Sequence, residues 1–360
     1  MFIKFIITVF ISISFISGFS QHTLKNHTII DGKVSEEDVR ENDIIYFTNG
    51  MLDSQFYEFP SISSDVNNNL FKVKTTLTYP HLYTVSFESE KPEIRFRGGD
   101  YFIDPSTDFL EVSALKLAGC NYVKGATFNE YKTKFIPYFA SNSESCTSAT
   151  IQSLSFKNGV EFDDKLLSYT LENQDSYVAL WALIIRIRFQ GHSPLYETIL
   201  DSFSDKIKKE KLWKIVHNDL QSIRINKGNK FPKLNLKNLQ HQSEILTIPK
   251  AEYILVYYWF SNCKPCLESF PHILNLYKKY KSKGFEIVSI SVDRTSRISN
   301  WEKVIKEYEL TWKNLLDENG KEAKKDKITT FPTTFLLDSD GKVLEKNITI
   351  GDLEEILRQI

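Results

Sequence analysis

The chain has 360 residues, of which 45 are Lys or Arg and 46 are Asp or Glu, so its formal net charge is −1. Its content of 41% hydrophobic and 25% charged residues is typical of globular proteins, and its length leaves room for two or three domains. No basic run is interleaved with aromatic residues, which argues against nucleic acid as a partner. The sequence carries no nucleotide or metal motif either, so we expect no cofactor and no metal.

The first 21 residues have the pattern of a secretory signal peptide. Lys4 forms a short positive region, residues 5–15 are an apolar run, and small or polar residues follow at 17–20. The run is shorter than the ~20 apolar residues that span a bilayer. We therefore expect 1–21 to be cleaved near Ser20 or Gln21, with no stable membrane span afterwards, and the protein to be exported to the periplasm or cell envelope.

Residues 22–119 carry the pattern of short β-strands. Apolar side chains alternate over 71–77 and 83–87. Further short apolar runs lie at 29–30, 44–47 and 101–103, separated by clusters of Asn, Asp, Gly and Pro. We predict a small antiparallel β-sandwich, with the aromatic residues Phe56, Tyr57 and Phe59 in its core rather than in a ligand site.

Residues 120–222 carry a helical pattern. The segment 176–185 is apolar almost all round, which suits a helix packed between others, and it is too short to cross a membrane. Segments 194–207 and 211–223 indicate two more helices. We predict a helical middle region that serves as a spacer or as a platform beside the active site.

Cys120 and Cys146 lie in or beside this helical region and leave two interpretations open. They could form a structural disulfide, because export places the protein in an oxidising compartment. The alternative is a pair of buried free thiols that act as small hydrophobic side chains.

Cys263 and Cys266, separated by two residues, are the chemically most informative pair in the chain. An apolar, aromatic-rich stretch at 253–260 precedes them and has the composition of a buried strand. Apolar residues recur at helical spacing over 267–277. The pair therefore lies at a strand-to-helix junction, where the helix N-terminus should lower the pKa of the first thiol and make Cys263 the nucleophile.

Two other uses of the pair are weaker. A structural zinc site needs four ligands, and the other two thiols, Cys120 and Cys146, are 26 positions apart from each other. An inert disulfide that spans two residues closes too small a loop to restrain the unfolded chain much. Thiol-disulfide exchange remains the favoured use.

The C-terminal part of the chain resembles a known family. The motif at 259–266, with Pro271 after it and the segment 330–335 further on, resembles the thioredoxin superfamily, and within it the secreted TlpA/ResA-like branch of thiol-disulfide oxidoreductases. The resemblance covers 223–360 and implies an α/β thioredoxin fold with a mixed central sheet flanked by helices. It also implies a β domain of uncharacterised function ahead of it. The strands expected at 285–292, 333–337 and 342–346, and the helices expected at 301–308 and 353–360, come in the family's order.

The resemblance assigns roles to single residues. It makes Cys263 and Cys266 catalytic, and it implies a cis bond between Phe331 and Pro332 that faces Cys263 and leaves the backbone of Phe331 free to pair with a substrate. The remaining assignments are Trp259 in substrate binding and Lys264, Pro265 and Glu268 in tuning the thiols. The charge of Lys264 either favours the thiolate of Cys263 or, as an exposed lysine, has little effect.

Three positions depart from the family pattern. Tyr257 stands where cytosolic thioredoxins have a buried aspartate, and Ser269 stands where the secreted branch commonly has a glutamate, with the acid moved to Glu268. Asn262 replaces a common tryptophan. The proton acceptor for Cys266 is therefore not identified.

The function expected from these features is reduction of disulfides in partner proteins by an exported oxidoreductase, with electrons from a membrane or envelope donor. A disulfide oxidase or isomerase runs the same chemistry in another direction. A protein of a different class, an envelope binding module with a non-catalytic thioredoxin domain, remains the alternative.

Overall fold

The computed structural model describes residues 28–35, 43–48, 62–88, 94–112, 122–140 and 150–360. The predicted signal peptide, the aromatic residues Phe56, Tyr57 and Phe59, and both Cys120 and Cys146 lie outside the described residues. The strands of the N-terminal part are β1 (Thr28–Val34), β2 (Ile44–Thr48), β3 (Ile62–Asp65), β4 (Leu70–Thr75), β5 (His81–Glu88), β6 (Ile94–Ile103), β7 (Phe109–Val112) and β8 (Tyr122–Lys124).

A group of helices follows these strands. They are α2 (Ala126–Glu130), η3 (Tyr131–Phe135), α3 (Ile136–Phe139), α4 (Ile151–Glu172), α5 (Tyr177–Gln190), α6 (Pro194–Asp201), α7 (Asp205–Lys209) and α8 (Lys211–Ser222). The C-terminal part contains β9 (Asn235–Lys237), β10 (Ser243–Ile245), β11 (Tyr253–Trp259), α9 (Lys264–Tyr280), η4 (Lys281–Lys283), β12 (Phe285–Ser291), η5 (Thr295–Arg297), α10 (Ile298–Glu307), β13 (Lys313–Leu316), η6 (Glu318–Gly320), α11 (Lys321–Lys325), β14 (Thr333–Asp338), β15 (Val343–Lys346) and α12 (Ile350–Leu357).

The N-terminal strands form two four-stranded sheets, in the orders β4-β1-β7-β8 and β3-β2-β5-β6. The sheets pack through their apolar faces, and the rings of Phe47 and Phe71, one from each sheet, lie 5.8 Å apart. A Cβ atom at Gly32 would lie 2.0 Å from the ring of Phe71, so this position of β1 requires glycine. Most neighbours are antiparallel, as the alternating pattern predicts, but β1 and β7 run parallel.

The helices share a hydrophobic core with the two sheets, and one continuous cluster of buried side chains extends from Ile30 to Ile223. Trp181 of α5 is fully buried, and its Nε1 donates a 2.9 Å hydrogen bond to the carbonyl of Pro80 just ahead of β5. Asp100 of β6 accepts hydrogen bonds from Tyr131 Oη (3.0 Å) and from the backbone N of Ile151 at the start of α4 (2.7 Å). Sheets and helices therefore form one packed unit.

The C-terminal part has a seven-stranded mixed sheet in the order β10-β9-β13-β12-β11-β14-β15. Strands β11, β12 and β13 are parallel, β14 is antiparallel to β11, and β15 is antiparallel to β14, so the predicted thioredoxin fold is confirmed. Both faces of β11 are buried. Leu255, Tyr257 and Trp259 face α9, α10 and α12, while Ile254, Val256 and Tyr258 face the side that carries α11.

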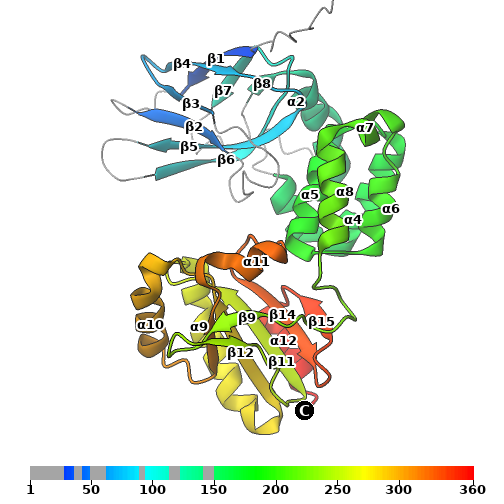
Figure 1. Cartoon of the computed structure of the whole chain (residues 1–360). Helices are drawn as coiled ribbons and strands as arrows, with labels where there is room; N and C mark the ends of the chain where they lie inside the picture. The colour runs from blue at the N-terminus through cyan, green and yellow to red at the C-terminus, as the bar shows by residue number, and fades with distance from the viewer. Residues whose placement is uncertain (1–27, 36–42, 49–61, 89–93, 113–121, 141–149) are drawn as a thin grey trace, which may run out of the picture.

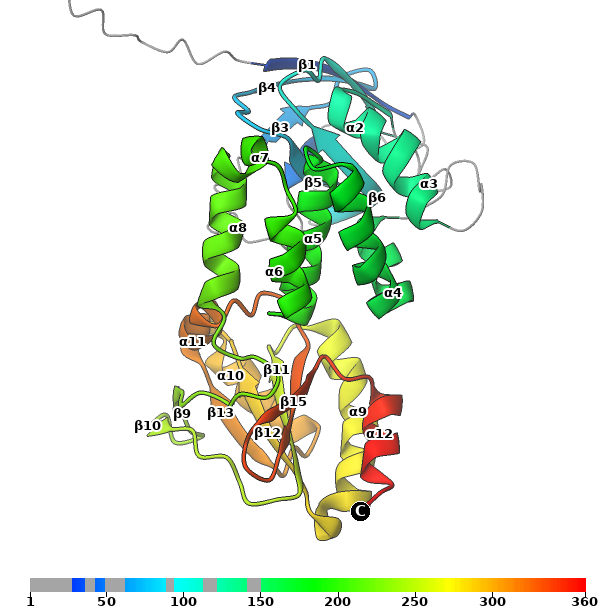
Figure 2. The ribbon, with the colours of Figure 1, turned by 90° about the vertical axis from the view of Figure 1, so that its right-hand side faces the viewer.

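The helices lie between the N-terminal sheets and the C-terminal sheet (Figures 1 and 2). Ion pairs and hydrogen bonds join the helical group and the segment that follows it to the C-terminal part. Arg224 Nε lies 2.7 Å from Asp326 Oδ1, and Lys327 Nζ lies 2.8 Å from Asp219 Oδ1. Asn347 Nδ2 donates a hydrogen bond to the carbonyl of Phe189 near the end of α5.

The helical region differs in detail from the pattern expected over 120–222. Tyr122–Lys124 forms β8 at the edge of the first sheet, and a strand of this length leaves no periodic signal in a sequence. The segment predicted as one helix at 194–207 is divided into α6 and α7 by Ser204, whose side chain caps the second helix. Within the part of the chain that the structure describes, no helix has the length and apolar character needed to cross a membrane.

Candidate active site

Strand β11 and helix α9 bring the two cysteines together at one end of the sheet. The buried strand ends at Trp259, and Cys263 is the N-cap residue of α9, with an extended backbone (φ −78°, ψ 95°). Its Sγ accepts a 3.3 Å hydrogen bond from the backbone N of Cys266. Cys263 and Cys266 form a disulfide, with Cα atoms 5.2 Å apart. The predicted strand-to-helix junction is confirmed.

The two sulfur-bearing residues differ in exposure. Cys263 retains 3% of its surface, whereas Cys266 retains none. An external thiol or disulfide can therefore reach Cys263 first, while Cys266 lies beneath it against the core. The N–H of Cys266 and the dipole at the N-terminus of α9 also stabilise negative charge on Cys263 Sγ.

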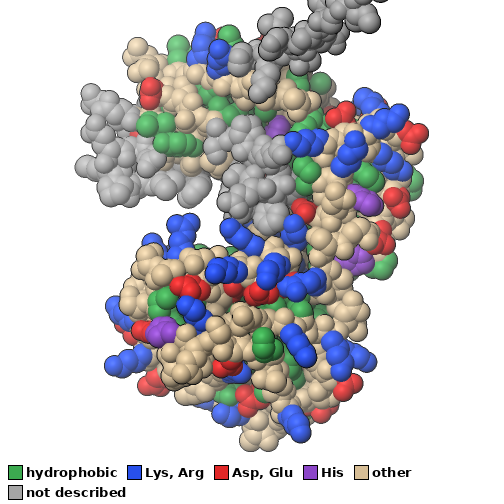
Figure 3. Space-filling model, in the orientation of Figure 1, with side chains coloured by type: hydrophobic (Ala, Val, Ile, Leu, Met, Phe, Trp, Pro, Cys, Tyr) green, Lys and Arg blue, Asp and Glu red, His purple; other side chains and the backbone are tan. Residues whose placement is uncertain are grey.

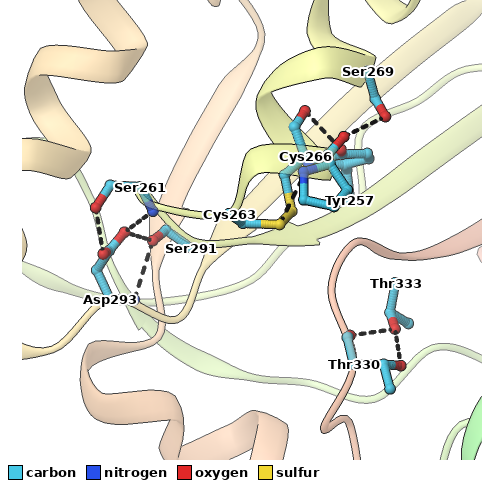
Figure 4. Close-up of a disulfide and its surroundings, with 10 residues drawn as sticks. Tyr257, Ser261, Cys263, Cys266, Ser269, Ser291, Asp293, Thr330 and Thr333 are labelled. Atoms are coloured by element: carbon cyan, nitrogen blue, oxygen red, sulfur yellow. Dashed lines mark hydrogen bonds between the residues drawn. A yellow bond between two sulfur atoms is a disulfide. The ribbon is translucent and has the colours of Figure 1, made fainter. Parts of the chain in front are cut away.

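Asp293, after β12, fixes the loop that precedes the disulfide. Its carboxylate accepts hydrogen bonds from Ser261 N (2.8 Å), Ser261 Oγ (2.7 Å) and Ser291 Oγ (2.6 Å), and all three residues are buried. Figure 4 shows this group beside Cys263. Because β11 and β12 are parallel neighbours, the loops that follow them meet at the same edge of the sheet. Asp293 was not predicted, because it lies 32 positions from Ser261 and no local motif links the two residues.

Tyr257 occupies the core beneath the second cysteine. Its Oη donates a 3.1 Å hydrogen bond to the carbonyl of Cys266 (Figure 4). Burial raises the pKa of the Tyr257 phenol above its usual range, so the group stays neutral and acts as a donor. Tyr257 therefore helps to fix the first turn of α9 and does not replace the acid that cytosolic relatives carry at this position.

The residues predicted to tune the thiols lie on the exposed side of α9. Lys264 and Glu268 are exposed, and Lys264 Nζ lies 3.8 Å from Glu268 Oε1. An exposed pair of this kind has a small effect. Pro265 stands in the first turn of the helix, where proline's missing N–H costs no hydrogen bond, and its carbonyl accepts a 2.8 Å hydrogen bond from Ser269 Oγ.

The loop that carries Phe331 and Pro332 adjoins the same edge of the sheet. The bond between them is cis, as the resemblance implies. The antiparallel register pairs Thr333 with Tyr258, which places Pro332 beside the end of β11. Phe331 is half-buried, and its ring lies edge-on to Phe260 at 5.5 Å. The disulfide thus lies between the Asp293 group and the loop of Thr330 and Thr333 in the view of Figure 4.

Trp259 lies deeper than its predicted role in substrate binding requires. Its side chain is fully buried and packs edge-on against Phe270 of α9, with ring centroids 5.0 Å apart. Any influence on a substrate would act through the packing of β11 against α9. His272, in contrast, is exposed on α9, as expected for an ordinary helix residue. Among the described residues, no group of three or more His, Cys, Asp or Glu side chains is arranged to hold a metal ion.

A family model and several known proteins are similar in sequence to the C-terminal part of the chain. The family described as thioredoxin-like matches residues 251–343. Thiol-disulfide oxidoreductase ResA of Bacillus thuringiensis subsp. konkukian is 32% identical over 137 residues, which are 37% of this chain and 78% of that protein. ResA of Bacillus subtilis is 29% identical over 132 residues, 36% of this chain and 71% of that protein.

A solved structure is similar over the same share of the chain. The thioredoxin domain of a thiol-disulfide oxidoreductase from Bacteroides vulgatus is 29% identical, with a TM-score of 0.34, and the match covers 38% of this chain and 97% of that domain.

Proposed function

Because the chain belongs to the thioredoxin-like family of thiol-disulfide oxidoreductases, we propose that it reduces disulfides of partner proteins through Cys263 and Cys266. The observation that carries the proposal is the disulfide at the N-terminus of α9, whose more exposed sulfur accepts the N–H of Cys266. This geometry supports a nucleophilic thiolate on Cys263 and a protected resolving thiol on Cys266.

The reaction proceeds in two exchange steps. The thiolate of reduced Cys263 attacks one sulfur of the partner's disulfide, a new S–S bond forms, and the partner's other sulfur leaves as a thiolate and takes up a proton. Cys266, after losing its proton, then attacks Cys263 Sγ and releases the partner's second thiol. Two electrons pass to the partner, and Cys263 and Cys266 end as the disulfide seen here. A dithiol donor in the envelope would return the pair to the reduced state.

The partner's chain would lie along the loop of Phe331 and Pro332. This loop adjoins the end of β11, is half-buried and contacts Phe260, so it offers a surface within reach of Cys263. An extended partner segment would add its backbone hydrogen bonds to this edge while its sulfur meets Cys263.

Two single substitutions test the reaction and serve as controls for each other. Cys263→Ser should lower the reduction of a protein disulfide to the rate of the donor dithiothreitol alone, because the attacking sulfur is lost. Cys266→Ser should accumulate a mixed disulfide with the partner, because the resolving sulfur is lost, and this product is seen by non-reducing electrophoresis and mass spectrometry. Both variants remove one thiol and the internal disulfide, so a difference between them reports the role of each residue.

The assignment is reversed if iodoacetamide modifies Cys266 faster than Cys263 in the reduced protein. An equal trapped fraction in both variants would also contradict it. The reducing direction is tested by the potential of the pair in glutathione buffers, since an oxidase should have a distinctly more oxidising couple than a reductase.

We also propose that the protein acts outside the cytoplasm. The support is the charged start at Lys4, the apolar run at 5–15 and the small residues after it. N-terminal sequencing of the protein from its native host should find a mature chain that begins near residue 21 or 22. A cytoplasmic protein that retains residues 1–21 would contradict the export.

A further inference from the structure

A pocket of about 400 Å³ opens beside the disulfide, between the loops that follow β11 and β12. Its lining residues are Phe260, Asn262, Val292, Asp293, Arg294 and Arg297. Asn262 directly precedes Cys263, so the pocket begins one residue from the sulfur that we assign as the nucleophile. Phe260 also contacts the ring of Phe331, so one wall of the pocket packs against the loop on which we place the partner's chain.

The charge of the pocket is positive at its rim. Arg294 and Arg297 are exposed, and neither guanidinium has an ion-pair or hydrogen-bond partner among the residues that the structure describes. Asp293, which also lines the pocket, is buried, and its carboxylate accepts three hydrogen bonds from Ser261 and Ser291 rather than pairing with either arginine. Figure 3 shows Lys and Arg side chains gathered along the edge of the C-terminal part that faces the N-terminal part.

Another carboxylate, Glu318, contacts Thr295, which stands between the two arginines in the sequence, and it is paired with a lysine. Glu318 accepts a 2.7 Å hydrogen bond from Thr295 Oγ1 and pairs with Lys237 Nζ at 2.6 Å. The rim of the pocket therefore offers two guanidinium groups, whose fork of N–H donors matches a carboxylate. Phe260 and Val292 supply an apolar wall, so the pocket suits a carboxylate on a short aliphatic stem.

We propose that this pocket binds an acidic side chain, Asp or Glu, that flanks the disulfide of the partner polypeptide, and that Arg294 and Arg297 thereby select partners with an acidic residue near the target cysteine. The proposal rests on the proposed function, since the partner's sulfur must meet Cys263. It deepens that function by naming the chemistry of the preferred substrate segment.

The test uses the full mature chain and three synthetic peptides with the same internal disulfide. The residue next to the first cysteine is Glu, Gln or Lys. The second-order rate of reduction by the pre-reduced protein is measured for each peptide. We expect the Glu peptide to react about three- to tenfold faster than the Gln peptide, as two exposed ion pairs allow, with the Lys peptide slowest. The preference should shrink in 0.5 M NaCl because exposed charges are screened.

The double variant Arg294→Gln/Arg297→Gln should reduce all three peptides at similar rates. The control Lys342→Gln/Arg358→Gln changes the net charge by the same amount at exposed positions. Lys342 follows the turn at the opposite end of β14, and Arg358 follows the end of α12 that lies away from Cys263. The control should keep the preference of the unmodified protein, which separates local recognition from net charge.

A second measurement keeps the pocket testable without any redox step. Peptides in which both cysteines are replaced by serine are titrated against the oxidised protein by fluorescence anisotropy, and the Glu peptide should bind tightest. Equal rates and equal affinities for the three peptides overturn the pocket proposal, as does a preference that survives in Arg294→Gln/Arg297→Gln. If the protein reduces no peptide yet binds the Glu peptide preferentially, the proposed function fails while the pocket is supported.

Discussion

Arg188 Nη2 at the end of α5 donates a 3.4 Å hydrogen bond to the carbonyl oxygen of Thr329, 141 positions further along the chain. Thr329 stands two residues before Phe331, so the helical region holds the start of the loop on which we place the partner's chain. Asn347, which follows β15, donates a hydrogen bond to the carbonyl of Phe189, the residue after Arg188, and so adds a second contact between the end of α5 and the C-terminal part.

The first prediction is that Arg188 positions this loop. Arg188→Ala should lower kcat/KM for a protein disulfide by about fivefold, which corresponds to about 1 kcal/mol for one long hydrogen bond from a charged group. The rate of alkylation of Cys263 by iodoacetamide should not change, because the thiol itself is untouched. Arg358→Ala, at an exposed position after α12, is the matched control. Equal losses in the two variants, or a change in alkylation rate, would refute a positioning role.

The second prediction concerns the domain division. We propose that 223–360 folds alone, because its two hydrophobic clusters contain only residues from Ile225 onward. The fragment should show a cooperative thermal transition and reduce a small disulfide. The fragment 22–119 should not fold by itself, because Trp181 and its neighbours on α5 complete its core. Circular dichroism and size-exclusion chromatography of both fragments test this, and an unfolded 223–360 fragment would count against the division.

The third prediction concerns the buried ion pair of α4 and α5. Arg186 Nε and Nη2 lie 2.6 and 2.8 Å from the two carboxylate oxygens of Asp163, and Tyr196 Oη donates a further 3.0 Å hydrogen bond to Asp163 Oδ2. Asp163→Ala leaves the buried guanidinium without its partner and should lower the free energy of unfolding by about 3–5 kcal/mol. The exposed neighbour Asp164 provides the control, and Asp164→Ala should change it by less than about 0.5 kcal/mol. Urea denaturation measures both, and equal losses would disprove the assignment.

The fourth prediction is a dependence of stability on pH that arises from His81. This residue is 3% exposed and stacks on Tyr79, with ring centroids 4.4 Å apart, and burial lowers its pKa from 6.5 to about 4. Between these values the unfolded chain binds a proton that the folded chain does not. The free energy of unfolding should therefore fall by about 3 kcal/mol as the pH drops from 6.5 to 4. His81→Gln should remove this fall.

Asp100 should act in the opposite direction over nearly the same range. Burial raises the pKa of its carboxyl from 3.8 to about 6, so the folded chain binds a proton first and gains stability as the pH falls through this interval. Asp100→Asn should make the acid loss of stability steeper than in the unmodified protein. Denaturation at pH 7, 5 and 4 separates the two variants, and parallel pH profiles for both would exclude these assignments.

The sequence predicted the C-terminal fold because its strands and helices carry strong periodic patterns. Strand β11 is apolar throughout, since both of its faces are covered, and Cys263 directly precedes a helix with a clear apolar stripe. The N-terminal part was harder to predict in detail. The parallel pairing of β1 with β7 joins segments far apart in the chain, and β8 is too short for periodicity to show.

The candidate site was predicted where its chemistry is local and missed where it depends on the fold. Two cysteines separated by two residues form a motif that can be read directly from the chain. Asp293 reaches Ser261 only because two parallel strands end side by side, and Arg294 and Arg297 reach the pocket in the same way. No spacing rule connects such residues in a sequence. Trp259 was predicted to contact substrate because it lies next to the cysteine motif, but its side chain is fully buried. Closeness to a motif in the sequence does not distinguish a residue of the site from one of the core.

The anchoring of the loop by Asp293 has a consequence for how this enzyme could diversify. Ser261 is hydrogen-bonded to Asp293, which follows the neighbouring strand β12. Lys264 and Pro265 are exposed, and their side chains take no part in these hydrogen bonds. The two residues between the cysteines can therefore be substituted without loss of the hydrogen bonds that hold the loop before Cys263. Mutation could retune the chemistry of the sulfur pair through that dipeptide while the orientation of Cys263 towards its partners is inherited unchanged.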